Sequence, residues 1–169
     1  MKPLHCLTLL ALSAGAWAGS LEIFTLTPSG PGQSLGVVEY EDNPYGLLLT
    51  PRLSGLPPGI HGFHVHDKPS CEAREVNGVA TPGSAAEGHW DPDNTGLHLG
   101  PYTPGGHRGD LPALYVDASG KASYPVLAPR LKAADLKGHS LMIHAGGDNH
   151  SDHPAKLGGG GARLACGVF

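Results

Sequence analysis

Residues 60–66 read IHGFHVH, and the alternation in the last four positions indicates a β-strand. Because side chains two apart in a strand lie on one face, His64 and His66 would share a face while Phe63 and Val65 point into a core. Two imidazoles on one face can bind the same metal ion. By itself, however, a His-x-His pair fits surface histidines better than metal ligands, so its meaning depends on the rest of the chain.

The strand pattern continues on both sides of this segment. Short apolar stretches bounded by Gly, Pro or Asn-Pro recur at the spacing typical of a meander or a sandwich. The predicted strands cover residues 21–27, 34–40, 45–53, 60–66, 111–117, 121–126, 140–144 and 162–167. A turn around residues 132–136 is the helical candidate. Because 26 Gly and 16 Pro residues punctuate turns and interrupt helices, we expect an all-β protein.

Two long segments between the predicted strands lack a strand pattern. They are residues 67–110 and residues 148–161, and they hold about half of the ionisable side chains. Irregular segments of this size in a compact domain are usually functional or disordered. The four glycines at 158–161 lack the Lys-Ser/Thr ending of a phosphate-binding loop, so we interpret them as turn backbone.

Length and charge limit the classes of protein to consider. A chain of 169 residues with 40% hydrophobic and 15% charged content can form one core but not two ordinary domains. The net charge of -4 argues against a nucleic-acid partner, which usually requires a clustered excess of Lys and Arg. The eleven histidines are the unusual feature of the composition.

The first residues have the pattern of a secretory signal peptide. Lys2 supplies a positive start, residues 7–15 are apolar, and small residues precede a cleavage point after Ala18. The apolar run is much shorter than the roughly 20 residues that a helix needs to cross a bilayer. We therefore predict residues 1–18 as a signal peptide and residues 19–169 as one exported domain without membrane insertion.

The three cysteines fit an exported protein. Cys6 precedes the apolar run, which disfavours a lipid anchor at that residue, and cleavage would remove it. Cys71 and Cys166 remain, and an oxidising compartment favours a disulfide between them. Two free buried thiols are the alternative.

The long segment at 67–110 carries a second group of donors: His89, His98, His107 and Asp110. Three imidazoles and a carboxylate form the donor set of a closed tetrahedral zinc site, which leaves no position for water or substrate. Ligation would also give this irregular segment a reason to be ordered. His144 ends a predicted strand and could complete a copper site with His64 and His66, since copper binds imidazole nitrogen tightly and changes valence.

Four stretches of the chain together resemble a known family. They are GFHVH at 62–66, HWDPDNTGLHLGPYTPGGHRGDLP at 89–112, LMIHAGGDN at 141–149 and LGGGGARLACGV at 157–168. In this order they resemble the copper-zinc superoxide dismutases, in particular the bacterial periplasmic branch. The resemblance runs from about Leu21 to Phe169. It implies an eight-stranded antiparallel Greek-key β-sandwich or barrel, immunoglobulin-like, with two long functional loops.

The resemblance also implies the roles of individual residues. Copper would be held by His64, His66, His89 and His144, and zinc by His89, His98, His107 and Asp110, with one ion of each per chain. His89 would then bridge both metals. Asp148 would accept hydrogen bonds from His64 and His98, and Arg163 would attract an anion beside the copper. A disulfide between Cys71 and Cys166 would tie the metal loop to the last strand.

The implied activity is the dismutation of superoxide in the periplasm. Two superoxide anions and two protons would become oxygen and hydrogen peroxide as copper alternates between copper(II) and copper(I), with His89 supplying one proton. The sequence does not decide between a monomer and a homodimer. A copper-carrying or copper-buffering protein of the same fold is the main alternative, but a carrier needs neither a zinc site nor Arg163. A zinc hydrolase would need an open metal position.

The other histidines are expected to be structural or solvated. His61 lies three residues before His64 and should bond the backbone at the start of its strand. His139, His150 and His153 are predicted to be solvated surface residues.

Overall fold

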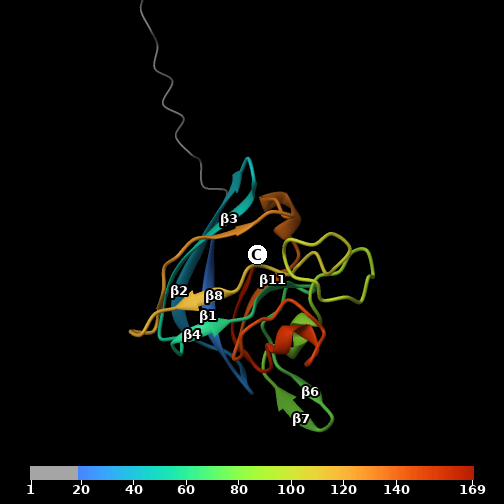
Figure 1. The fold of residues 1–169 in the computed structure, drawn as a ribbon. Coiled ribbons are helices and arrows are strands. Elements are labelled where there is room, and N and C mark those ends of the chain that lie inside the picture. The colour runs from blue at the N-terminus through green and yellow to red at the C-terminus, as the bar shows by residue number, and fades with distance from the viewer. Residues whose placement is uncertain (1–18) are drawn as a thin grey trace, which may run out of the picture.

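The computed structural model describes residues 19–169, and the predicted signal peptide at 1–18 lies outside the described residues (Figure 1). The regular secondary structure of the described chain is almost entirely β-strand. The strands are β1 (Gly19–Thr27), β2 (Gly30–Asn43), β3 (Gly46–Ser54), β4 (Gly59–His61), β5 (Phe63–His66), β6 (Arg74–Val76), β7 (Val79–Thr81), β8 (Leu114–Val116), β9 (Lys121–Ala122), β10 (Val126–Ala128), β11 (Ser140–His144) and β12 (Arg163–Val168). The short 3-10 helices are η1 (Ser84–Ala86), η2 (Ala133–Leu136) and η3 (Leu157–Gly159).

The main sheet is antiparallel and curled. Its strands follow the order β10-β3-β2-β1-β12-β11-β5, and β9 pairs with β3 off this path. The first strand therefore lies beside the last, and β5 is the final strand on the path. In Figure 1, β1, β2 and β3 lie on one side of β11 and the two long loops lie on the other. The all-β, eight-stranded antiparallel architecture predicted from the sequence is confirmed.

One predicted strand proves to be two. The segment at 60–66 is interrupted at Gly62, so β4 pairs with β8 whereas β5 pairs with β11. The Gly62 amide donates to Gly146 O at 2.8 Å, and its carbonyl accepts from the His144 amide at 2.9 Å. A Cβ at position 62 would lie 3.1 Å from the His64 ring, so glycine permits this close crossing. The segment predicted as a strand at 121–126 is likewise divided into β9 and β10, with Pro125 between them.

A hairpin within the segment at 67–110 was not predicted. Strands β6 and β7 pair through the turn Asn77-Gly78, and both turn residues have positive φ, 53° and 81°. Asn-Gly between alternating residues is a strong short-range hairpin signal, because both positions of a type I′ turn require positive φ. The sequence therefore contained the information for this element.

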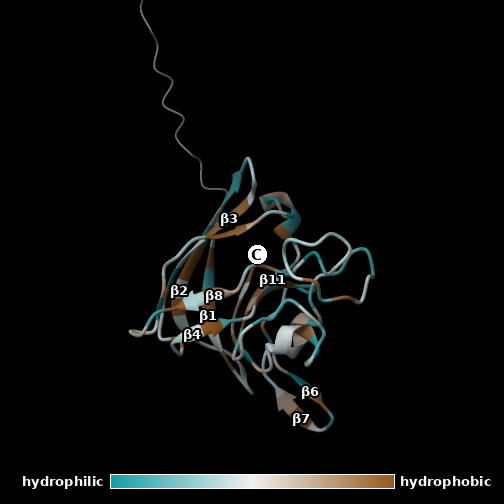
Figure 2. Ribbon diagram, viewed as in Figure 1, coloured by the Kyte–Doolittle hydropathy of each residue, from teal (hydrophilic) through white to brown (hydrophobic). Residues whose placement is uncertain are grey.

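The core lies inside the curl of the main sheet. Ile23, Leu47, Leu49, Phe63 and Val65 are fully buried there. In Figure 2 the hydrophobic residues gather along the strands. The predicted turn at 132–136 is confirmed as η2, whose Leu136 packs into this core. Among residues 19–169 no helix has the length and apolar character needed to cross a membrane.

Candidate metal centre

The edge of the sheet brings the metal-ligand candidates together. On β5, His64 pairs with Met142 of β11, and all four residues of β5 are buried. Isolated antiparallel bridges then join His64 to Asp110 and His66 to His89. The long loop thus runs along the free edge of β5 at two places, which explains how residues more than twenty positions away reach His64 and His66.

Ring nitrogens of the predicted copper set converge. His64, His66, His89 and His144 each offer a ligand atom within 4.8 Å of the others. The Nε2 atoms of His66 and His144 lie 3.4 Å apart. The His66 Nδ1 donates to Glu87 O at 2.8 Å and His144 Nδ1 to Gly161 O at 3.3 Å. Each of these two rings therefore turns its Nε2 toward the common centre.

The electrostatics of this set fit a bound cation. Burial lowers the pKa of His64 and His66, with repulsion from His89 adding to the effect, and burial lowers the pKa of His144 to about 4. The rings are therefore neutral and present lone pairs. Buried His64 Nδ1 has no hydrogen-bond partner, which is costly unless a metal ion accepts its lone pair. This donor set suits copper because all four donors are imidazole nitrogens, which copper binds tightly.

The predicted zinc set gathers around one carboxylate. Asp110 Oδ1 lies 3.0 Å from His89 Nδ1, and Asp110 Oδ2 lies 3.0 Å from His98 Nδ1. His107 Nδ1 lies 3.5 Å from Asp110 Oδ1. It is farther from the other donors, since the ligand atoms of His89, His98 and Asp110 lie within 4.8 Å of one another and His107 is not part of that group. The Nδ1 atoms of His98 and His107 are buried, and despite these short distances neither makes a hydrogen bond. Electron-rich atoms that face one another in a dry site fit a shared cation such as zinc.

Asp148 connects the two sets. Its Oδ2 accepts from His64 Nε2 at 2.7 Å, and its Oδ1 accepts from His98 Nε2 at 2.8 Å. Burial would raise the pKa of Asp148, but its hydrogen bonds with His64, His98 and the His150 amide outweigh burial and hold the pKa well below its usual range. Burial likewise opposes protonation of His98, yet Asp110 and Asp148 raise its pKa to about 9. One carboxylate therefore orients both rings so that each Nδ1 faces a donor set.

Asp148→Asn is expected to weaken the binding of both copper and zinc by about 10- to 100-fold. The amide has one acceptor oxygen, so one of the two histidines would face an NH2 group instead of a carboxylate oxygen. Competition with chelators of known affinity measures the effect. Asp93→Asn is the matched control, because Asp93 is an exposed carboxylate in the loop that carries the zinc-ligand candidates. Unchanged affinity for both metals in Asp148→Asn would contradict the prediction.

A hollow leads to the copper set. It has a volume of about 250 Å³ and is lined by His66, His89, His144 and Arg163, together with Lys156 and several glycines. Arg163 begins β12, and its guanidinium donates to Gly83 O and Glu87 O. Sequence reasoning singled out Arg163 but missed Lys156, whose signal was a lone cation beside the glycine run.

Glu87 is a second residue that sequence reasoning missed. Its carbonyl accepts from both His66 Nδ1 and Arg163, so it links a copper-ligand candidate to the arginine at the hollow. Its backbone has φ 62° and ψ -147°, a region that is close to glycine-only. Nothing in the residue type indicated this conformation.

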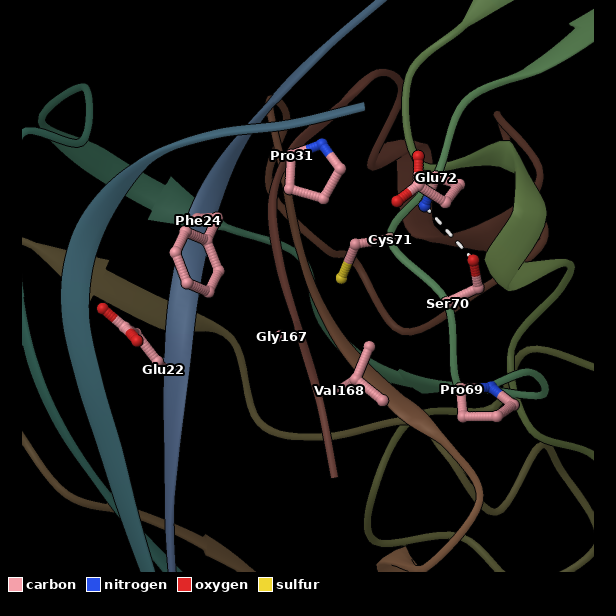
Figure 3. A pocket seen from close by; sticks show the side chains of 9 residues that line it. All are labelled: Glu22, Phe24, Pro31, Pro69, Ser70, Cys71, Glu72, Gly167 and Val168. Carbon is pink, nitrogen blue, oxygen red and sulfur yellow. Dashed lines mark hydrogen bonds between the residues drawn. The ribbon is translucent and has the colours of Figure 1, made fainter. Parts of the chain in front are cut away.

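The predicted disulfide is present. Cys71 and Cys166 are bonded, with their Cα atoms 5.7 Å apart. They pack with Ala86, Met142 and Leu26 in a small cluster separate from the main core. Figure 3 shows Cys71 beside Gly167 in the wall of a separate hollow of about 390 Å³, which contains no histidine.

The remaining histidines differ in their surroundings. His61 is buried, and its ring nitrogens lie 2.7 Å from His144 O and 2.8 Å from Pro57 O, so the predicted backbone role is confirmed. The solvated-surface prediction holds for His153, which is exposed. It is wrong for His139, which is half-buried.

His139 is half-buried because it packs against the backbone of residue 67 and against Trp90. Its Nδ1 donates to Asp67 O at 2.9 Å, and its ring lies 4.6 Å from that of Trp90. His150 is also half-buried: its side chain packs against Gly100 of the zinc loop. Both environments are created by loops that fold back onto the strand edge.

Comparison with known proteins agrees with this geometry. The family model described as copper/zinc superoxide dismutase (SODC) matches residues 34–169. The chain is 58% identical over 145 residues to the superoxide dismutase [Cu-Zn] of Haemophilus ducreyi, which covers 85% of this chain and 73% of that protein. It is 56% identical over 172 residues to superoxide dismutase [Cu-Zn] 1 of Salmonella typhimurium, covering 96% and 97% of the two chains. The solved Cu/Zn superoxide dismutase from Brucella abortus has a TM-score of 0.86 at 50% identity, covering 89% of this chain and 97% of that one.

Proposed function

This chain belongs to the copper/zinc superoxide dismutase family, and on that premise we propose which of its residues carry out the reaction and where in the cell they do so. The protein is an enzyme that converts two superoxide anions and two protons to oxygen and hydrogen peroxide. It uses copper and zinc. The assignment of these ions to individual side chains is our proposal.

His64, His66, His89 and His144 hold copper, and His89, His98, His107 and Asp110 hold zinc. Copper supplies the electron exchange with superoxide, and zinc supplies a fixed charge that orders the loop. The single observation that carries this assignment is the pair of converging donor sets on either side of His89, with unpartnered ring nitrogens buried in both. Asp148 holds His64 and His98 in the required orientation.

Arg163 and Lys156 attract the anionic substrate into the hollow beside His66 and His144. A guanidinium has five N–H donors, and the bonds to Gly83 O and Glu87 O leave others for an anion. Because those two carbonyls hold the guanidinium, it does not have to be ordered when substrate arrives. Preorganised charge of this kind favours both encounter and reaction.

His89 delivers one of the two protons. Burial lowers the pKa of His89 despite the opposing hydrogen bond with Asp110, so a proton on its ring is released readily. The ring also lines the hollow in which the peroxide product forms. It is therefore within the same cavity as the substrate that needs the proton.

We place the mature enzyme, residues 19–169, in the periplasm after removal of residues 1–18. The signal-like pattern of the first residues and the bacterial origin of the relatives support this location. The Cys71–Cys166 disulfide is also typical of an oxidising compartment.

Purified mature protein is expected to bind one copper and one zinc per chain and to consume superoxide, because the two four-donor sets share His89. Elemental analysis gives the metal content, and stopped-flow measurement of superoxide decay gives the rate. His64→Ala should lose copper and nearly all activity, whereas His153→Ala, a matched change at an exposed histidine, should lose neither.

Two outcomes would contradict the assignment in different ways. A protein that holds only one kind of metal, at one ion per chain, after exposure to both ions would contradict the two-site interpretation. Full copper and zinc content without superoxide consumption would instead favour the copper-carrying alternative.

A further inference from the structure

Arg130 lies where the barrel wall meets the loop that carries the zinc-ligand candidates. It lies two residues after the end of β10, next to Pro129, and its side chain is half-buried. The guanidinium donates to four backbone carbonyls of the loop: Pro101 O at 3.0 Å, Gly106 O at 3.2 Å, Gly100 O at 3.0 Å and His107 O. One side chain thus donates hydrogen bonds to two separate segments of the same loop, residues 100–101 and residues 106–107.

The position of Arg130 is itself fixed by the barrel. On one side, Ala128 pairs with Leu47 in the main sheet. On the other side, Leu131 is almost completely buried in the main core. The arginine backbone therefore cannot follow the loop, and the loop is held against a fixed point.

The carbonyls that Arg130 binds lie between two zinc-ligand candidates in the sequence. His98 precedes them and His107 is the last of them, and the His107 amide closes the loop by donating to Leu97 O at 2.9 Å. Without a cation between them, four carbonyl oxygens would point their negative ends at one another. The planar guanidinium, with five donors in a fixed fork, satisfies them together.

We propose that Arg130 is a positioning residue that preassembles the zinc site by holding the loop of residues 100–107 in its metal-binding shape. The proposal rests on the zinc-ligand set given above. Arg130 belongs to neither donor set and does not line the hollow, and it acts through the backbone of His107 and the residues before it. With the loop held, His98 and His107 do not have to be ordered at the moment zinc binds, so the entropic cost of binding falls.

Arg130→Met tests this, because methionine keeps an unbranched apolar stem and removes all the donors. Zinc transfer from the fully metallated protein to a colorimetric chelator is expected to be about 10 to 100 times faster than in wild type. Arg130→Lys should lie between the two, because one ammonium group cannot reach the carbonyls as a fork. Arg52→Met is the matched control, since Arg52 is an exposed arginine of β3 paired with Glu39.

Two further measurements separate positioning from general stability. The visible absorption of Co²⁺ bound in place of zinc reports ligand geometry, and it should change in Arg130→Met but not in Arg52→Met. Urea unfolding of the metal-free protein should be nearly the same in both variants, because the loop adds little to the barrel core. Equal losses of barrel stability and zinc retention in Arg130→Met would show a merely structural arginine and overturn the proposal.

The experiments distinguish a wrong assignment of the zinc ligands from a wrong role for Arg130. A wild-type protein that holds no zinc, or a His107→Ala variant that holds it as tightly as wild type, would overturn the ligand set and the proposal with it. A wild type that holds zinc no more firmly than Arg130→Met, with His107→Ala clearly weaker, would overturn the Arg130 proposal alone.

Discussion

Replacing both Cys71 and Cys166 by Ala is expected to lower the free energy of unfolding by about 4 to 5 kcal/mol in the chain-entropy description of a crosslink. The disulfide closes a loop with a sequence separation of 95 residues, so its loss frees a large part of the unfolded chain. The change corresponds to a shift of about three orders of magnitude in the folding equilibrium. Chemical denaturation of the metal-free double variant and of oxidised wild type, side by side, measures the difference.

Loss of the disulfide should also disturb the residues that hold Arg163 at the active site. Cys71 anchors the segment that leads to Gly83 and Glu87, whose carbonyls hold the Arg163 guanidinium. The double variant, loaded with both metals, is therefore expected to consume superoxide more slowly than wild type. Reduced wild-type protein is the control, and its denaturation midpoint should match that of the double variant. A double variant within about 1 kcal/mol of oxidised wild type would show that the segment is held by its packing alone.

Arg163→Ala is expected to lower the second-order rate constant for superoxide by about tenfold or more with both metals still bound. The full sequence has a net charge of -4, which repels an anion, so attraction has to come from cations at the hollow. Because salt screens this attraction, the wild-type rate should fall as ionic strength rises, and the variant's rate should fall less steeply. Stopped-flow rates over a range of salt concentrations, with metal content measured in each sample, test both expectations.

The control for this change is Arg74→Ala. Arg74 lies on the β6–β7 hairpin and is an exposed arginine paired with Glu87, 3.4 Å away, so its loss should change the rate by less than about twofold. Arg163→Lys should recover part of the activity because it restores the charge but not the fork that binds two carbonyls. Full activity and an unchanged salt response in Arg163→Ala would mean that Arg163 serves only to brace the loop. The guiding charge would then have to lie elsewhere, with Lys156 the next cation on the hollow.

The strands and the ligand candidates could be predicted because they leave local patterns. Alternation along residues 63–66 indicated a strand with two histidines on one face, and β5 has this range. The Asn77-Gly78 turn was equally readable and was overlooked. The donors at His89, His98, His107 and Asp110 stood out as residue types that have little reason to gather in an irregular segment unless they bind a metal.

The sequence by itself determined the fold class, the two cysteines available for a disulfide and which side chains are candidates for each metal. Only the tertiary structure decided how these parts are held. Glu87 adopts a near glycine-only conformation, and Arg130 reaches carbonyls of residues 23 to 30 positions away. Asp148 joins His64 and His98 across separations of 84 and 50 residues. Periodicity records only which face a side chain takes within its own element, whereas contacts to backbone carbonyls depend on where distant segments cross and leave no trace in residue type.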